Sequence, residues 1–322
     1  MSARTRFKTL LKSAAQSALP EPLYAQLSIV YHHGLAGLAH VYAQKRVGAP
    51  PADIPQDKRG EFTMGGTVPV LYWYLDDRAF CPVYNSKETY EAVFAQLDAG
   101  TFEYYGKEGL SFYGALSRYG LAGKTVLVFG LAGCNCEAMA VWKGAELVYV
   151  VDYNKPKCEH ERVTVLSMEE FRAGGVKVDA AFSFSSFEHD GLGRYGDPVS
   201  PDADISAMKL ARDVVKPGGL MFFGVPLGSD CLVWNAHRVY GRKRLPLMLD
   251  GWTVEDAYYF NDMDDILGGE LGAYRQPLLV LKNERPKREA VLAKLERERE
   301  RERERELLLG SSYFTRCAGR AA

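Results

Sequence analysis

From Lys124 onward, short runs of β-branched and aromatic residues alternate with stretches of helical periodicity. This alternation is typical of a parallel sheet whose strands are joined by crossover helices. The predicted strands are Thr125–Phe129, Leu147–Val151, Val163–Leu166, Asp179–Ser185 and Leu220–Val225. The predicted helices lie near Glu137–Lys143, Met168–Ala173 and Ile205–Val214. Two later apolar runs, Trp252–Phe260 and Pro277–Leu281, can close the sheet as an antiparallel hairpin. We therefore expect an α/β fold.

The 322 residues are enough for one sizeable α/β core with additions, and the net charge of −1 gives no global sign of nucleic-acid binding. We divide the chain into a basic, partly helical region at 1–60, a lead-in segment at 61–123 that packs on the core, the α/β domain at 124–283 and a charged helical tail at 284–322. The tail contains an unbroken Glu-Arg alternation, which is either a solvated extension or a docking arm and could form a coiled coil.

The six cysteines are sparse and scattered, which favours reduced thiols and a cytoplasmic location. The sequence contains no run of roughly 18 or more apolar residues, so it predicts no transmembrane helix. Residues 2–19 are basic and contain serines, so they predict either organellar targeting or simply a first basic helix.

The first candidate site is the turn after the first predicted strand, where Gly130 and Gly133 lie in the segment GLAGCN. Glycine lets a backbone turn sharply and approach a ligand closely. Asp152 follows the second strand and can accept hydrogen bonds from the two ribose hydroxyls of a nucleotide-like cofactor. The alternative is a tight turn and a helix cap with no ligand.

A polar, glycine-rich loop follows the strand that ends at Ser185. His189 is a candidate general base and Arg194 a candidate clamp for an anionic group. The alternative is that Glu188 and Asp197 pair with these two side chains inside a structural loop.

Polar side chains gather again in WNAHRVYGR, at 234–242. The candidates for the substrate side of a cleft are Asn235, His237, Arg238 and Tyr240. If this segment is a helix, Asn235 and Arg238 share one face while His237 lies elsewhere. The alternative is an insertion that packs its aromatic residues on the sheet. The segment KPGG at 216–219 predicts a turn before the fifth strand.

Cys134 and Cys136 follow the first strand, and Cys158 and His160 follow the second. Four soft ligands could converge on zinc there, but the spacing departs from the usual pattern. We therefore predict no metal site and ordinary reduced cysteines.

The order of these motifs resembles that of class I S-adenosylmethionine-dependent methyltransferases, over about Lys124 to Asn283. The resemblance implies a Rossmann-like sheet, S-adenosylmethionine as cofactor, and cofactor contacts from Gly130, Gly133, Asp152, Ser185 and Ser186. Three long stretches also resemble the family of unknown function numbered two hundred and sixty-eight, which has a methyltransferase-like fold. They are FEHDGLGRYGDP, DISAMKLARDVVKPGGLMFFGVPLG and VWNAHRVYGRKRLP. Two departures are that Val128 replaces the acid usual in strand one and Ala132 replaces the second glycine of the turn.

The sequence therefore predicts a methyltransferase for a small-molecule or carbohydrate-type acceptor, with no nucleic-acid partner. His189, Arg194 and His237 would be catalytic, and Asn235, Arg238 and Tyr240 would bind substrate. The alternative is a catalytically inactive, methyltransferase-like scaffold that binds a protein through its charged tail. A nicotinamide-dependent enzyme is disfavoured because the third glycine of the dinucleotide fingerprint is missing.

Overall fold

The computed structural model describes residues 48–78, 83–105, 107–258 and 266–284. The chain divides into two units, Met1–Asn283 and Glu284–Ala322, and the description concerns the first of them. The segment at 2–19, the predicted N-terminal helix and the Glu-Arg tail lie outside the described residues. In the part that is described, no helix combines the length and the apolar character needed to cross a bilayer.

Seven strands form the main sheet in the order β12-β14-β8-β7-β3-β4-β6. The strands are β3 (Thr125–Phe129), β4 (Leu147–Val151), β6 (Val163–Leu166), β7 (Val178–Phe184), β8 (Val215–Gly224), β12 (Trp252–Tyr258) and β14 (Leu278–Asn283). All neighbouring pairs are parallel except those of β14, which runs antiparallel to both β8 and β12. This is the Rossmann-like arrangement of class I methyltransferases, mostly parallel with a final antiparallel hairpin, so the predicted fold class is confirmed.

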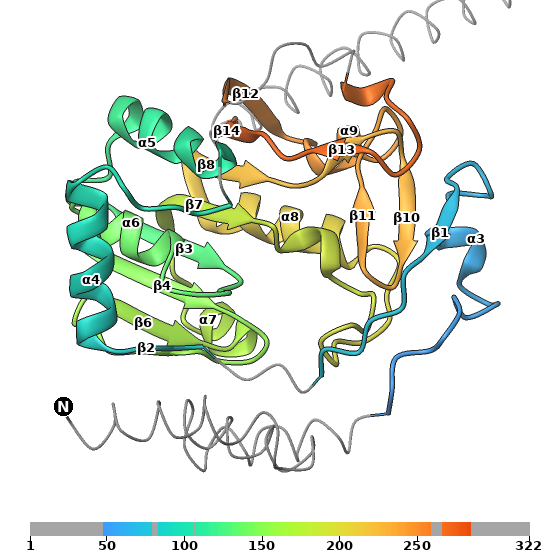
Figure 1. The fold of residues 1–322 in the computed structure, drawn as a ribbon, viewed down its shortest axis with the longest axis horizontal. Coiled ribbons are helices and arrows are strands. Elements are labelled where there is room, and N and C mark those ends of the chain that lie inside the picture. Colours follow the sequence, from blue (N-terminus) through green and yellow to red (C-terminus); the bar gives the residue numbers. More distant parts are fainter. Residues whose placement is uncertain (1–47, 79–82, 106, 259–265, 285–322) are drawn as a thin grey trace, which may run out of the picture. The chain divides into compact units, whose positions relative to one another are not determined.

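Helices cover both faces of this sheet (Figure 1). These helices are α4 (Lys87–Asp98), α5 (Lys107–Tyr119), α6 (Cys136–Trp142), α7 (Met168–Ala173), α8 (Ala203–Val214) and α9 (Leu245–Met248), and a 3₁₀ turn, η1, lies at Phe187–His189. The short helix α3 (Arg59–Phe62) packs away from this sheet, with Phe62 against Trp234. The predicted helices agree with α6, α7 and α8 to within two residues.

Alternating side chains of β3 explain the two layers. Val126 and Val128 point into the core beneath α4, α5 and α6, whereas Leu127 and Phe129 point into the core beneath α7, α8 and α9. A strand buried on both faces has no polar alternation, and β3 accordingly has four buried residues in succession.

Helix α5 is attached to the sheet through stacked rings. The ring of Phe112 stacks on Phe182 at 6.0 Å between centroids, and Phe182 stacks on Phe222 at 4.7 Å. Helix α5 thus packs directly on β7 and, through Phe182, on β8. Helix α4 begins after Ser86, which is its N-cap, and the preceding Asn85 turns inward and donates to Glu137.

A second, three-stranded sheet has the order β1-β10-β11. It is formed by β1 (Val70–Tyr72), β10 (Cys231–Trp234) and β11 (His237–Val239). The segment at 234–242 is therefore not a helix, because it contains the end of β10, the turn and β11. Val239 pairs with Cys231 across the hairpin, and their cluster packs against Leu71 and Leu75 of the lead-in segment, which outweighs the local polar pattern. Two-stranded pairs complete the fold: β2 (Tyr84–Asn85) with β5 (Lys157–Cys158), and β9 (Leu227–Gly228) with β13 (Tyr274–Arg275).

The KPGG segment lies within β8 rather than before it. The pairing of β7 with β8 jumps from Val215 to Leu220 while β7 advances by only two residues, so residues 216–219 bulge out of the sheet. The bend predicted from the sequence is present as a bulge, in which Gly218 has a φ of 78°.

A buried charge cluster joins α8 to the β10–β11 hairpin. The Asp204 carboxylate accepts hydrogen bonds from Arg244 Nη2 at 2.6 Å, Arg244 Nε at 2.9 Å and the Tyr240 hydroxyl at 2.9 Å. Arg238 Nε lies 3.6 Å from the same carboxylate. Because all four side chains are buried, removal of the central charge leaves two cations without compensation.

We expect Asp204→Asn to lower the free energy of unfolding by about 3–5 kcal/mol, the usual effect of breaking a buried ion pair on one side. Urea unfolding followed by circular dichroism measures this. Lys155→Ala is the control, because it removes the exposed ion pair with Glu170 and should change stability by about 0–1 kcal/mol. Equal effects of the two variants would contradict the assigned importance of the buried cluster.

Candidate functional site

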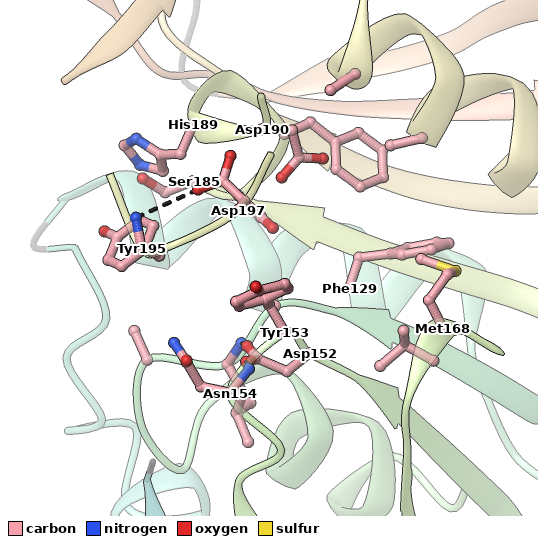
Figure 2. Close-up of a pocket in the computed structure, with 18 of the residues that line it drawn as sticks. Phe129, Asp152, Tyr153, Asn154, Met168, Ser185, His189, Asp190, Tyr195 and Asp197 are labelled. Carbon is pink, nitrogen blue, oxygen red and sulfur yellow. Dashed lines mark hydrogen bonds between the residues drawn. The ribbon is translucent and has the colours of Figure 1, made fainter. Parts of the chain in front are cut away.

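A cavity of about 820 Å³ lies at the carboxyl ends of β3, β4 and β7. Figure 2 shows Asp152, Tyr153 and Asn154 on one side of it and His189, Asp190 and Asp197 on the other. Its size is within the range of roughly 300–1,000 Å³ that is typical of small-molecule sites. Ligands of open α/β sheets bind at this edge, because the chain leaves neighbouring strands in different directions there.

The turn after β3 and the acid after β4 are in direct contact. Leu131 N donates to Asp152 Oδ2 at 2.8 Å, and Asn154 N donates to Asp152 Oδ1 at 2.6 Å. Gly130 is in the left-handed region, with a φ of 72°, and its N–H donates to the Val151 carbonyl. The structure therefore brings Gly130 and Asp152 together on the cavity wall, as the sequence predicted.

The end of β7 closes on the same turn. A Cβ added to Gly130 would overlap the Ser186 hydroxyl, so glycine at 130 permits the contact between the two loops. Ser185 also lines the cavity and has a φ of 53°, which is strained for a residue with a side chain. Strain of this kind gathers at functional sites, where the surrounding structure maintains it.

The remaining predicted turn residues lie differently. Gly133 is not among the residues that line the cavity, and its nearest neighbour outside the adjacent backbone is the side chain of Asn135. Ala132 does line the cavity, whereas Val128 is buried in the sheet core. Val128, at the position of the usual strand-one acid, thus does not line the cavity.

The opposite wall is held by hydrogen bonds between one side chain, that of Asp197, and the backbone of the glycine-rich loop. The carboxylate of Asp197 accepts hydrogen bonds from the N–H groups of Gly191, Gly193 and Tyr195. Tyr153, from the β4 side, donates through its hydroxyl to the Gly196 carbonyl at 2.8 Å. This bond connects the loops on the two sides of the cavity.

A second chamber of about 250 Å³ adjoins the first. The two share Tyr105, Ser185 and His189, and Glu188 and His237 line the second chamber alone. His189 thus faces both spaces, and His237 lies away from the proposed cofactor turn. The ring centroids of these two histidines are 6.5 Å apart.

His189 is held as a neutral ring. Its Nδ1 lies 2.7 Å from the Ala236 carbonyl oxygen, which can only accept, so Nδ1 carries the proton and Nε2 is bare. Burial lowers the pKa of His189 to about 3, although the Ala236 carbonyl opposes this, and the Arg194 cation lowers it further. An imidazole with this pKa is a weak base at neutral pH.

Glu188 directly precedes His189, and its pKa is shifted in the opposite direction. Burial raises its pKa to about 7. Its Oε1 lies 3.7 Å from His189 Nε2. Within the described residues, its Oε2 is buried with no hydrogen-bond partner.

Arg194 pairs with a residue that the sequence did not indicate. Its Nε donates to Asp77 Oδ2 at 2.7 Å and its Nη1 to the Ala236 carbonyl at 3.3 Å. Arg194 does not line the first cavity, and Asp197, its suspected partner, binds backbone instead. The guanidinium acts on the site through its charge, which lowers the pKa values of Glu188 and His237.

The structure places three predicted substrate residues inside the scaffold. Asn235 is fully buried, where Oδ1 accepts from Leu75 N at 2.8 Å and Nδ2 donates to Leu75 O at 2.9 Å. Arg238 donates to the carbonyls of Asp190 and Pro201, and Tyr240 donates to Asp204. We assign them no contact with substrate, because neither chamber is lined by any of them.

The cysteines near the glycine turn are buried thiols. Burial raises the pKa of Cys136 to about 12 and that of Cys158 to about 11, so both are protonated at neutral pH, whereas metals bind the thiolate. Within the described ranges, no group of three or more His, Cys, Asp or Glu is arranged to hold a metal ion.

Sequence reasoning missed Glu188, Tyr105, Tyr153 and Tyr274 as wall residues. Glu188 was visible beside His189 but was taken for its structural partner. The aromatic residues come from loops and short strands distant in sequence, and no local motif marks them. The available signal was the strand end itself, since any residue that follows β7 or β4 lies at this edge of the sheet.

Residues 123–267 match the model of a family described as Caenorhabditis protein of unknown function, DUF268. No curated protein matches the chain significantly. Among solved structures, similarity extends to 1,6-didemethyltoxoflavin-N1-methyltransferase from Burkholderia thailandensis, with 16% identity, 61% of this chain and 85% of that chain covered, and a TM-score of 0.41.

Two further solved structures are similar at the same low level. TehB from Haemophilus influenzae has 11% identity, with 60% of this chain and 67% of that chain covered and a TM-score of 0.36. A candidate hemolysin from Streptococcus thermophilus has 16% identity, with 63% and 78% covered and a TM-score of 0.35. The three long motifs quoted from the sequence all lie within the matched range of the family model. Over residues 123–267, the chain is thus similar to the family of unknown function DUF268.

Proposed function

We propose that this protein is an S-adenosylmethionine-dependent methyltransferase that acts on a small-molecule or carbohydrate-type acceptor. The observation that carries the proposal is the carboxylate of Asp152 against the turn after β3, on the wall of a cavity large enough for a nucleoside. The strand order of the sheet supports the proposal, since it puts this pair at the edge where such folds bind ligands.

The residues present fit the cofactor. Gly130 leaves no side chain between the turn and Ser186, and Asp152 offers a carboxylate to the two hydroxyls of a ribose. Phe129, Leu131 and Met168 supply apolar wall for an adenine ring. A small-molecule partner is part of the proposal, and the free cysteines among the described residues favour a cytoplasmic site of action.

When bound, S-adenosylmethionine supplies an electrophilic methyl group whose sulfonium sulfur keeps the electron pair of the bond that breaks. The protein's own contribution is mostly proximity and orientation. Asp152 and the Gly130 turn would hold the nucleoside, and Tyr153, bonded to Gly196, would limit the access of water. Ser185 and His189, which border both chambers, would face the acceptor.

We expect Asp152→Asn to weaken the affinity for S-adenosylhomocysteine at least tenfold, about 1.4 kcal/mol, because one acceptor oxygen becomes a donor. Isothermal titration calorimetry measures the affinity. Asp179→Asn is the matched control: this carboxylate accepts from Thr125 N at 3.0 Å at the opposite end of β3. A wild-type protein that is folded yet gives no heat with S-adenosylhomocysteine would refute the proposed function.

Gly130→Ala tests the turn. The positive φ costs alanine about 1–2 kcal/mol, and the new Cβ also meets Ser186, so we expect lower stability and at least tenfold weaker binding of S-adenosylhomocysteine. Gly175→Ala is the control, because Gly175 has a φ of 60° but open space around it. This variant should be less stable than the wild type and should keep its affinity for S-adenosylhomocysteine. Thermal unfolding and calorimetry separate the two effects, and adding Ser186→Gly should restore part of the stability. Wild-type affinity in Gly130→Ala would contradict the role of the turn.

A further inference from the structure

The second chamber has features of a ligand site in its own right. It is lined by polar groups from three parts of the chain: Glu188 and His189 from η1, His237 from β11, and Arg275 and Gln276 at the end of β13. At about 250 Å³ it lies below the roughly 300–1,000 Å³ of drug-sized sites, so it suits a single ring better than a nucleotide. It meets the first cavity at Ser185 and His189.

Glu188 is the group in this chamber whose bonding is incomplete. Its side chain is 1% exposed, and Oε2 has no hydrogen-bond partner within the described residues. An unsatisfied buried carboxylate oxygen is unfavourable by several kcal/mol in general, and such atoms in a folded protein point to a ligand or a function. A ligand hydroxyl in the chamber would donate to this oxygen.

His189 beside it cannot replace Glu188 as proton acceptor. Its Nδ1–H is held by the Ala236 carbonyl, and Nε2 faces Glu188 Oε1 at 3.7 Å. The ring therefore has a fixed orientation and a weakly basic nitrogen. Glu188 is the stronger base of the two, and its pKa near 7 is suited to general-base work at neutral pH.

Tyr274 lines the chamber, and Trp73 lies beside one of its lining residues, His237. His237 lies 5.4 Å from the ring of Tyr274 and 6.5 Å from that of Trp73, between centroids. Trp73 is 59% exposed and Tyr274 is 46% exposed, although large aromatic residues normally bury their rings. Exposed aromatic faces beside hydrogen-bonding groups fit a ligand that has both an apolar face and hydroxyls.

We propose that the second chamber binds a hydroxylated ring of monosaccharide size and that Glu188 takes the proton from the hydroxyl that reacts. This inference rests on the proposed methyltransferase function and names its acceptor class. The hydroxyl donates to Glu188 Oε2 in the bound complex. As the hydroxyl oxygen forms its new bond to carbon, the O–H bond breaks, its electron pair stays on that oxygen, and the proton moves to Glu188. Glu188 becomes a neutral carboxylic acid and later releases the proton to solvent.

Several charged and titratable groups act on Glu188 and set its titration. The Ser185 hydroxyl, backbone N–H groups of Ser186 and Glu188, and the Arg194 cation all lower its pKa against the effect of burial. Other groups feel its negative charge: Asp190, Tyr105, Tyr195 and Tyr240. The active form is the carboxylate, so function should fall as the pH drops through about 7.

Binding is tested without reference to catalysis. Saturation-transfer difference NMR of the full chain is recorded with the methyl glycosides of glucose, galactose, mannose, rhamnose and fucose, with and without S-adenosylhomocysteine. We expect saturation of at least one glycoside, reduced at least fivefold in Tyr274→Ala, because this tyrosine lines the chamber. Tyr72→Ala is the matched control, because this exposed tyrosine on β1 bonds Asp53 and does not line the chamber. No saturation of any glycoside by a folded protein overturns the inference.

Glu188 is tested by its titration. Carbon-13 NMR of the protein labelled at glutamate carboxyls is compared between wild type and Glu188→Gln. Burial raises the pKa of Glu137 to about 7 as well, and the variant distinguishes the two signals because only that of Glu188 disappears. We expect one carboxyl, absent in the variant, with a midpoint near pH 7. A midpoint near the ordinary value of 4.5 overturns the assignment.

The two proposals fail in different ways. With the glycoside that binds, Glu188→Gln should lower methyl transfer about 10²–10⁴-fold while the affinity for S-adenosylhomocysteine is unchanged. Transfer at the wild-type rate by this variant refutes Glu188 as the base. Normal binding of S-adenosylhomocysteine with no glycoside binding refutes the acceptor class alone, whereas absent binding of S-adenosylhomocysteine refutes the proposed function.

Discussion

The hydrogen bond from Leu131 N to Asp152 holds the ends of β3 and β4 in a fixed relation, and the cavity depends on it. Parallel strands bring their carboxyl ends to one edge of a sheet, but each loop could then leave in any direction. The carboxylate accepts from the turn and also from Asn154, so one side chain orders both loops. Gly130 completes the arrangement, since the absence of a Cβ lets Ser186 approach from β7.

The second constraint is the charge cluster around Asp204. It explains why Arg238 and Tyr240, polar residues in a suggestive loop, belong to the scaffold. The Asp204 carboxylate from α8 balances the charge of Arg238 and accepts a hydrogen bond from the Tyr240 hydroxyl. The sequence predicted α8 but gave no indication of these contacts. The cluster supports the β10–β11 hairpin, which in turn places His237 at the second chamber and the Ala236 carbonyl against His189.

Much of the candidate site could be predicted, because it follows strand ends. Gly130, Asp152, Ser185 and Ser186 each come directly after a strand whose bounds periodicity located to within a residue, and the cavity is lined by all four. Glu188 was passed over, because a glutamate beside a histidine is indistinguishable in sequence from a surface ion pair. It is buried, and the strand β11 that packs against η1 lies some 50 residues further along the chain.

The sequence by itself determined the order and type of the main-sheet strands and of α6, α7 and α8, because runs buried on both faces and helices with one apolar face leave strong local patterns. It also determined the resemblance to the family. Only the tertiary structure decided that 234–242 is a hairpin, that Arg194 pairs with Asp77 and that His189 is neutral while Glu188 is poised near pH 7. The reason is that burial, desolvation and ion pairing are set by neighbours that lie tens of residues away, 47 for His189 and Ala236 and 117 for Arg194 and Asp77, and no local pattern encodes them.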